Sequence, residues 1–473
     1  MKTNLKFKRF SIALFFALGA LVISSCTSDD DNPTPVDNST QFTINTLLDG
    51  NGDVTETIVT IQDRGEGTGT VTLTRNRTWV LDGLVFVNSG QTLTIEEGTI
   101  IKGKSGQGEN ASALVVAKGA TIMAQGSATL PIIMTAESDQ IRRKADDSAY
   151  ENGGNLPTTA RGLWGGLIVL GDAILNSTPG QSAIEGIPTT ESRGIYGGSN
   201  DADNSGVISY VSIRHGGTDI GAGNEINGLT LGGVGSGTDI NHVEIIANND
   251  DGIEFFGGTA RIKNAVVTLV GDDAIDYDEG WRGFIQYALV YQPGDRGGEH
   301  DGGTSPEDGT PYATPVIANV TSIGKGMAAG KRALTFRDNA GGQYWNSIFT
   351  EWGKGVDVED LASGEDSRNR LEMNDLQYQN NIHWNVANND AALQVVSSNG
   401  DDLLTHQNVV GNDVDNVMML GVLPTSTRAN TTNWPSGLDA FFTQSQFAGA
   451  FDPSGSDMWH EGWTLTDEAN VIQ

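Results

Sequence analysis

Residues 238–303 read TDINHVEIIANNDDGIEFFGGT, ARIKNAVVTLVGDDAIDYDEGW and RGFIQYALVYQPGDRGGEHDGG, three consecutive segments of 22 residues each. The motif DDGIEF at 250–255 recurs as DDAIDY at 272–277. A period in this range is typical of repeat proteins, in which one unit cannot bury its own apolar face and packs against its neighbours. The stretch therefore predicts a repeat architecture.

The spacing within each segment indicates strands. Apolar residues alternate with polar ones, as at Ile262, Ala265 and Val267, and runs of Gly, Asn and Asp separate these stretches. Two short strands and two or three turns in one period predict one coil of a parallel β-solenoid, whose coils lie about 4.8 Å apart. Equivalent residues should therefore stack, with Ile253 beside Ile275.

The same frame recurs along the chain. A strand-like motif recurs, and each copy is centred on a polar or aromatic residue. The centres are Tyr210, His242, Asn264, Tyr287, Asn319, Asn346 and Asn380. Successive centres are 32, 22, 23, 32, 27 and 34 residues apart. The shortest spacings predict bare coils, and the longer ones predict coils that carry inserted loops. Loops inserted into a solenoid tend to gather on one face, which is often the binding face.

The N-terminus has the pattern of an export signal. Lys2, Lys6, Lys8 and Arg9 precede the apolar run 11–23, which is too short to span a membrane as a helix. Residues 23–26, ISSC, resemble the lipobox of bacterial lipoproteins, which implies that Cys26, the one cysteine, is acylated. The acidic residues that follow resemble the signal of lipoproteins sent to the outside of the outer membrane.

These observations predict four segments. Residues 1–25 are a lipoprotein signal peptide, 26–45 a flexible acidic tether, 46–384 the parallel β-helix, and 385–473 the C-terminal coils and a cap. The aromatic C-terminal stretch, with Trp459 and Trp463, is expected to close the last coil.

Charge narrows the class of partner. The chain has 60 acidic against 28 basic residues, a net charge of −32. Such a surface repels nucleic acid and anionic lipid head groups, so anchoring to the outer membrane is expected to come from the lipid alone.

The acidic residues also cluster in the turns of adjacent predicted coils. Carboxylates that stack one coil apart disfavour joint ionisation, and hard carboxylate oxygens are the ligands that Ca²⁺ takes. The predicted Ca²⁺ ligands are Asp250, Asp251, Glu254, Asp272, Asp273 and Asp276. The alternative is that these residues only satisfy the backbone of turns.

A family resemblance rests on several motifs: WGGLIVLG at 164–171, NDDGIEFFGG at 249–258, GDDAID at 271–276, and GAF at 449–451 with GWT at 462–464. They resemble a family of exported bacterial lipoproteins with a pectate-lyase-like right-handed β-helix. The resemblance implies an all-β fold, a right-handed parallel β-helix with inserted loops and a C-terminal cap, and a place at the cell surface. It implies no established reaction.

An enzymatic interpretation also exists. Polygalacturonase-type glycosidases share the β-helix and, like this chain, have an Asp-bearing turn, an Asp pair about one coil later, a His and a basic strand. Inverting hydrolysis needs one carboxyl as acid and another as base. The candidates for a hydrolase, or for a lyase with a basic residue as base, are Asp251, Asp272, Asp273, His300, Lys331 and Arg337. His300 lacks glycines on both sides, which departs from that pattern, so no catalytic residue is assigned.

Three functions remain open. The leading prediction is a surface lipoprotein that binds an extracellular polymer, a polysaccharide above all, through the loop-bearing face. Aromatic side chains that stack on sugar rings are predicted at Trp281, Tyr291, Trp345 and Trp352, with inward packing as the alternative. The second is a polysaccharide hydrolase or lyase, and the third is a structural or adhesive stalk.

Overall fold

Strands one coil apart pair in parallel and in register, as the 22-residue period predicts. In the computed structural model Ile253 pairs with Ile275 and Glu254 with Asp276. The structure describes residues 42–143, 150–151, 156–221, 224–410, 417–427 and 440–472. The predicted signal peptide, Cys26 and most of the predicted tether lie outside this range. The first strand, β1 (Phe42–Leu48), begins inside the range predicted as tether.

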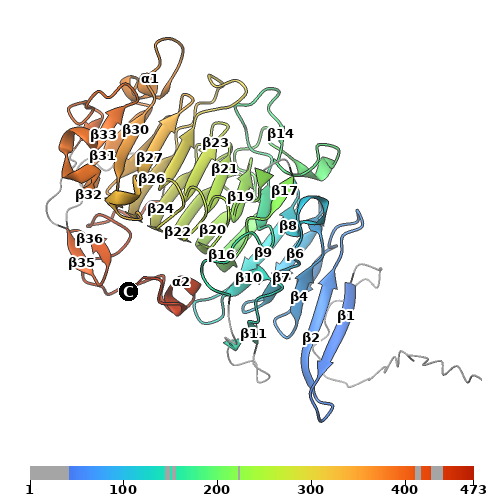
Figure 1. Ribbon diagram of the computed structural model, residues 1–473. Helices are drawn as coiled ribbons and strands as arrows, with labels where there is room; N and C mark the ends of the chain where they lie inside the picture. The colour runs from blue at the N-terminus through green and yellow to red at the C-terminus, as the bar shows by residue number, and fades with distance from the viewer. Residues whose placement is uncertain are drawn as a thin grey trace, which may run out of the picture. The chain divides into compact units, whose positions relative to one another are not determined.

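Two large sheets make up the coils (Figure 1). The ten-stranded sheet contributes one short strand to each coil. In stacking order its strands are β5 (Leu84–Val87), β8 (Ala113–Val116), β13 (Leu167–Leu170), β19 (Leu229–Gly232), β21 (Ile253–Phe256), β23 (Ile275–Asp278), β25 (Gly298–Asp301), β27 (Arg332–Arg337), β30 (Lys354–Val358) and β33 (Val395–Ser397).

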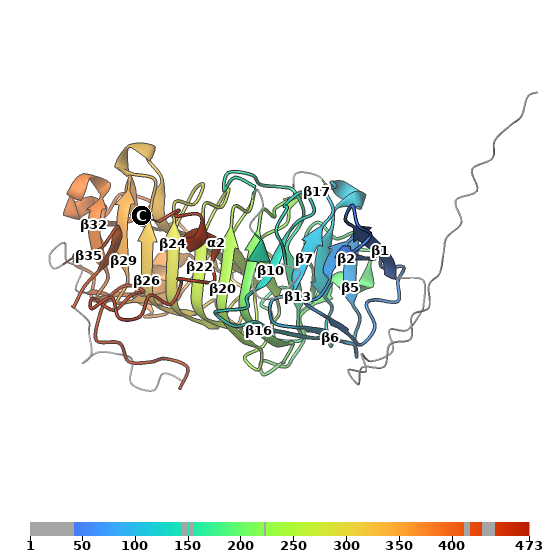
Figure 2. The same cartoon turned by 90° about the horizontal axis from the view of Figure 1, so that it is seen from below.

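The eighteen-stranded sheet, here called the long sheet, supplies the rest of each coil. Its strands after β1 are β2 (Val54–Ile61), β3 (Val71–Leu73), β4 (Thr78–Leu81), β6 (Thr92–Ile95), β7 (Ile100–Gly103), β9 (Thr121–Gln125), β10 (Ile132–Ala136), β16 (Gly206–Arg214), β20 (Asp239–Ile246), β22 (Arg261–Thr268), β24 (Phe284–Tyr291), β26 (Val316–Ile323), β28 (Gly342–Trp345), β29 (Ile348–Trp352), β31 (Leu376–Gln379), β32 (Ile382–Val386) and β34 (Val409–Val410). Figure 2 shows β16 to β26 side by side.

The recurring centre of the frame is the bend of each long-sheet strand. All seven of these residues have left-handed φ angles, between 49° at His242 and 62° at Asn264 and Tyr287. The residues on either side pair with the next coil, Ser209 with Asn241 and Val211 with Val243, so the bend interrupts the ladder for one residue. Asn tolerates this conformation better than most residues, which explains its frequency at the position.

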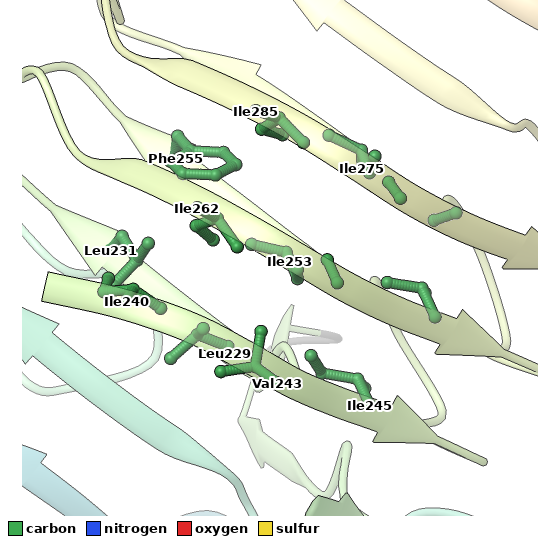
Figure 3. Packing of buried hydrophobic residues seen from close by; sticks show 14 of the residues in the cluster. Leu229, Leu231, Ile240, Val243, Ile245, Ile253, Phe255, Ile262, Ile275 and Ile285 are labelled. Atoms are coloured by element: carbon green, nitrogen blue, oxygen red, sulfur yellow. The ribbon is translucent and has the colours of Figure 1, made fainter. Parts of the chain in front are cut away.

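The core is a continuous stack of apolar side chains inside the coils (Figure 3). Ile253 and Ile275 of the ten-stranded sheet face Ile262 and Ile285 of the long sheet, and each is at most 1% exposed. Burying such a side chain contributes about 1.5–3 kcal/mol. Because neighbouring coils share this stack, the fold is the predicted all-β parallel β-helix.

One long excursion covers part of the outer face of the ten-stranded sheet. Residues 171–205, here called the cover loop, leave the coil after β13 and contain the short antiparallel strands β14 (Ser182–Ala183) and β15 (Ile195–Tyr196). Ile184, Ile187 and Tyr196 of this loop pack on Ile168 and Leu170 of β13 in a second apolar cluster. The outer face of the first coils is therefore buried.

The sequence predicts that the C-terminal segment closes the last coil, but the segment lies elsewhere. Residues 440–472, here called the C-terminal strap, run back over the outer face of the long sheet and end in the short helix α2 (Leu465–Glu468). Ala450 N donates to Thr321 Oγ1 of β26 at 2.9 Å, and Leu465 N donates to Glu244 Oε2 of β20 at 2.8 Å. The prediction of a cap over the last coil is wrong for the strap, because polar groups along the long sheet bind its backbone.

The remaining elements are short. They are the antiparallel pairs β11 (Arg142–Arg143) with β12 (Tyr150–Glu151), β17 (Asp219–Gly221) with β18 (Asn224–Glu225), and β35 (Met418–Leu420) with β36 (Leu423–Thr425), and the helix α1 (Ser367–Glu372). Over the described part of the chain, none of the helices has the length and apolar character needed to cross a membrane.

Candidate functional site

Acidic side chains form a row on the outer face of the ten-stranded sheet, directly after the coils that the cover loop buries. Glu254 of β21 pairs with Asp276 of β23, and Asp276 pairs with Glu299 of β25. Asp251 and Asp273 lie in the turns just before β21 and β23. Because parallel register repeats each position one coil later, acids at equal positions in the sequence become neighbours in space.

The carboxylates approach closely enough to share cations. Three overlapping groups each place one oxygen per residue within 4.8 Å of the others. The groups are Asp250, Asp251 and Asp272; Asp251, Glu254 and Asp276; and Asp272, Asp273 and Asp295. All six predicted Ca²⁺ ligands are brought together. We call these seven residues with Glu299 the acidic face.

Asp295 is a member that sequence reasoning missed. It lies one coil after Asp272, in QPGDRGG at 292–298, where a Pro and three glycines interrupt the likeness to the two earlier turns. The signal was present in the spacing alone, because 23 residues separate Asp272 from Asp295.

Backbone amides hold two of the carboxylates in place. Asp273 N donates to Asp251 Oδ1 at 2.8 Å, and Arg296 N donates in turn to Asp273 Oδ1. Each carboxylate thus accepts from the turn one coil later. The Arg296 guanidinium also contacts Asp273 Oδ2 at 3.1 Å and Glu299 Oε1 at 3.2 Å. These contacts fix the geometry of the acidic face before any ligand binds.

Burial makes full ionisation of this face costly. Burial, and next the neighbouring carboxylates, raise the pKa of Asp251, Glu254 and Asp276 well above the ordinary range. The pKa of Asp250 is raised to about 7 and that of Asp273 to about 8, again chiefly by burial. Arg296 lowers the pKa of Asp273, but burial outweighs that single partner. A divalent cation would keep these groups ionised.

Two buried side-chain oxygens at the acidic face lack hydrogen-bond partners among the described residues. Asp276 Oδ1 is buried and has no hydrogen-bond partner within the described ranges. The Asn227 side chain is 2% exposed and its amide donates to Glu254, while its own Oδ1 is also unpaired there. Buried oxygens are normally satisfied. Asp276 belongs to the group formed with Asp251 and Glu254, and Asn227 contacts Glu254 of the same group. The oxygens of this group suit a hard cation.

His300 cannot serve as a catalytic residue on this face. Its side chain is fully buried and stacks on Tyr277 at 4.3 Å inside the coils, and its Nε2 shares a 2.8 Å hydrogen bond with Tyr344 Oη. Burial lowers its pKa to about 3. The alternative catalytic prediction is therefore wrong for His300, because the period-2 alternation of β25 turns this side chain inward.

The basic candidates are held by acids. Arg337 Nε donates to Asp301 Oδ1 at 2.7 Å, and its Nη1 lies 2.9 Å from Glu299 Oε1. These partners raise the pKa of Arg337, which is unfavourable for a base. Lys331 Nζ lies 2.9 Å from Asp295 Oδ1. Both side chains border the acidic face and neutralise part of its charge.

The predicted stacking aromatics do not form a surface. Trp281 is 0% exposed, Trp352 1% and Trp345 5%. Trp281 stacks on Phe255 at 3.9 Å within the core, and Trp352 Nε1 donates to the backbone of Ser322. Tyr291 is half-buried against the cluster under the strap. The prediction of exposed rings is wrong for the three tryptophans, since Trp281 and Trp352 pack inside the coils and Trp345 packs on the long sheet under the strap.

The loops lie where the leading prediction needs them. The inserted segments 302–315 and 359–375 follow strands of the ten-stranded sheet, and 215–228 and 324–331 precede them. They therefore border both ends of its strands. The cover loop reaches the acidic face as well. Its Tyr196 Oη donates to Glu279 Oε2 beside that face at 2.7 Å, and after burial and nearer carboxylates its Glu185 adds to the rise in pKa of Asp250 and Glu254.

The coils and the acidic face define a parallel β-helix protein with a carboxylate-rich sheet. The profile of the pectate-lyase-like β-helix domain family matches residues 65–149 and 152–464, and the chain belongs to that family. The match indicates a polysaccharide-related function. Comparison with curated proteins found no match, and neither did comparison with solved structures.

Proposed function

We propose that this protein binds an extracellular polysaccharide at the acidic face, through Ca²⁺ held by the three carboxylate groups. The observation that carries the proposal is the overlap of these groups on the outer face of the ten-stranded sheet, next to the apolar stretch under the cover loop and bordered by loops. Ca²⁺ takes six to eight oxygen ligands. Three carboxylates leave coordination positions that sugar hydroxyls or sugar carboxylates can fill.

Charge argues for this role of the cation. The chain has a net charge of −32, so an acidic polysaccharide is repelled unless a cation lies between the two. Asp272 is exposed and Asp250 and Asp295 are half-buried, so the outermost groups face solvent where a polymer would lie. Arg337 and Lys331 at the border add positive charge for contacts with the same polymer.

We further propose that the protein is anchored in the outer membrane through a lipid on Cys26 and faces the cell exterior. The support is the ISSC motif at 23–26 and the acidic residues after it. Metabolic labelling with a fatty acid tests the anchor. Wild-type chain should incorporate label and partition into detergent, whereas Cys26→Ala should do neither; equal labelling of both would remove the lipid anchor.

A polysaccharide-binding assay tests the main proposal. Polygalacturonate, alginate and a neutral xylan are each immobilised, and binding of the full chain is measured in Ca²⁺ and in chelator. We expect binding to an acidic polymer in Ca²⁺ only, and at least about tenfold weaker binding by Asp272→Asn/Asp273→Asn. Asp53→Asn, an exposed acid in the β1–β2 turn, is the matched control.

The same assay separates the alternatives. Release of reducing ends would indicate a hydrolase instead of a binding protein, and release of unsaturated sugars would indicate a lyase. Asp251, Asp272 and Asp273 remain the candidate acids for either reaction. Absence of binding with a lower melting temperature for the double variant would favour a structural stalk. Equal binding in Ca²⁺ and in chelator would contradict the role of the cation.

A further inference from the structure

A cavity lies between the long sheet and the C-terminal strap, on a different face from the acidic face. Its volume is about 630 Å³. One wall comes from the bends of four consecutive coils and the other from the strap. The residues that line it are Ala128, Tyr210, His242, Asn264, Tyr287, Thr443, Phe447, Ala450, Asp452, Asp457, Trp459 and Glu461.

The bends present aromatic rings to this cavity. A left-handed φ occurs at this position in the seven coils from Tyr210 to Asn380, and Asn occupies it at Asn319, Asn346 and Asn380. Over the cavity Tyr210 and Tyr287 adopt the same conformation, at φ 50° and 62°, although it is unfavourable for large side chains. Unfavourable backbone that persists beside a cavity is a reason to look for function there.

The rings are held in fixed positions. Tyr210 stacks on His242 at 4.2 Å with an interplanar angle of 10°, and Trp463 packs edge-on against both rings. Trp459 lies 6.4 Å from His242 and is fixed by a 3.0 Å hydrogen bond from its Nε1 to Ala450 O. Each lining ring is only partly buried, so ring surface remains available to a ligand.

The charged residues that line the cavity are acidic. Asp452, Asp457 and Glu461 line it, and no Lys or Arg does so among the described residues. Burial lowers the pKa of His242, so this imidazole is neutral at neutral pH. Burial first, and then the Asp457 carboxylate, raise the pKa of both Tyr210 and Tyr287, which shows that this acid lies near both hydroxyls.

We infer that this cavity binds an organic ammonium group, seated against the Tyr287 ring and paired with the Asp457 carboxylate. Aromatic faces carry negative potential and attract ammonium groups within about 6 Å, and three carboxylates add to that attraction. At the rim, Lys263 already places an ammonium 5.9 Å from the centre of the Tyr287 ring, where it donates to Phe441 O and Thr443 Oγ1. Anionic ligands are disfavoured by the same charges.

Two sources supply such a group: an amino sugar and a free alkylammonium compound. The inference does not depend on the polysaccharide function, because the cavity and the acidic face share no residue. Ligand-observed NMR on the full chain, at constant ionic strength, uses glucosamine, N-acetylglucosamine and tetramethylammonium as probes. The N-acetyl sugar has the same ring without the charge, so it separates recognition of the cation from recognition of the sugar.

We expect saturable binding of glucosamine, tetramethylammonium or both, with no binding of N-acetylglucosamine. Asp457→Asn should weaken binding at least about fivefold and Tyr287→Asn at least about tenfold. Tyr287→Asn preserves folding, because Asn occupies the equivalent bend in the next coil at Asn319. Asp53→Asn should bind as the wild type does, and circular dichroism melting confirms that each variant is folded.

The outcomes divide cleanly. Binding of glucosamine alone identifies an amino sugar, and binding of tetramethylammonium alone identifies an alkylammonium ligand. Equal binding of glucosamine and its N-acetyl derivative overturns the inference in favour of neutral sugar stacking. Failure of both cations to bind, or unchanged binding by folded Asp457→Asn and Tyr287→Asn, also overturns it.

Discussion

One row of outward-facing positions on the ten-stranded sheet changes character along its length. In register it reads Phe86, Val115, Ile168, Thr230, Glu254, Asp276 and Glu299. The first three side chains are apolar and at most 2% exposed, because the cover loop packs on them. The last three are acidic and lie where that cover ends. The same backbone thus carries an apolar stretch under the cover loop and an acidic stretch beyond it.

The largest expected effect comes from placing the open face's residue type under the cover. Ile168→Asp buries a carboxylate among Ile184, Ile187 and Tyr196, and should lower the free energy of unfolding by roughly 3–5 kcal/mol. Ile168→Val, which removes one methylene, should cost only about 1 kcal/mol. Urea denaturation measures both. Similar midpoints for the two variants would show that the cover loop does not seal this face.

The acidic face should lower the free energy of unfolding as pH rises, whereas salt-bridged carboxylates lose their contribution as pH falls. Asp250 and Asp273 have folded-state pKa values of about 7 and about 8, above the unfolded value near 4. Their contribution is complete below about pH 4 and is lost as pH rises through 7 and 8.

In chelator we therefore expect the melting temperature to fall by several degrees from pH 5 to pH 8. Added Ca²⁺ should restore more stability at pH 8 than at pH 5, since the cation binds the ionised groups. A melting temperature that rises over this range in chelator would contradict the raised pKa values.

Removing one acid from the row sharpens the contrast. Asp276→Asn eliminates a carboxyl group whose ionisation is opposed by burial and by Glu254 and Asp251. In chelator at pH 8 the variant should melt a few degrees above the wild type, because it relieves repulsion. In Ca²⁺ the order should reverse. A variant that melts below the wild type in both conditions would show that Asp276 is a structural turn residue only.

The smallest effect is expected at the contact between the cover loop and the acidic part of the ten-stranded sheet, here called the seam. Tyr196 of the cover loop donates from Oη to Glu279 at 2.7 Å, next to the acidic face. Tyr196→Phe keeps the ring against Phe256 and should cost about 1 kcal/mol. Thermal melting of the variant measures this cost. No change would indicate that the seam is held by apolar packing alone.

Sequence periodicity was sufficient for the parts of the molecule that depend on neighbouring coils. Ile253 beside Ile275, and the gathering of Asp250, Asp251, Asp272 and Asp273, follow from a 22-residue spacing. Contacts between distant segments leave no such period. Glu244 binds backbone 221 and 222 residues away in the strap, and nothing in its local sequence indicates that partner.

Side-chain direction at the corners was likewise beyond the pattern. Trp281 follows β23 in a turn, where period-2 alternation no longer applies, and it packs inward on Phe255. Two aromatic residues that are partly exposed, Tyr210 and Tyr287, lie at the bends of the recurring frame. The frame thus located them without showing that they face a cavity.

Direct titration of the full chain with Ca²⁺ at pH 7.5, by isothermal calorimetry after removal of cations with chelator, tests the central claim that the open acidic row is a cation-dependent binding face. We predict saturable binding that Mg²⁺ does not reproduce, because Ca²⁺ accepts the larger and less regular oxygen set, and loss of that binding in Asp272→Asn/Asp273→Asn. No Ca²⁺-specific heat, or an identical titration for the double variant, would contradict the claim.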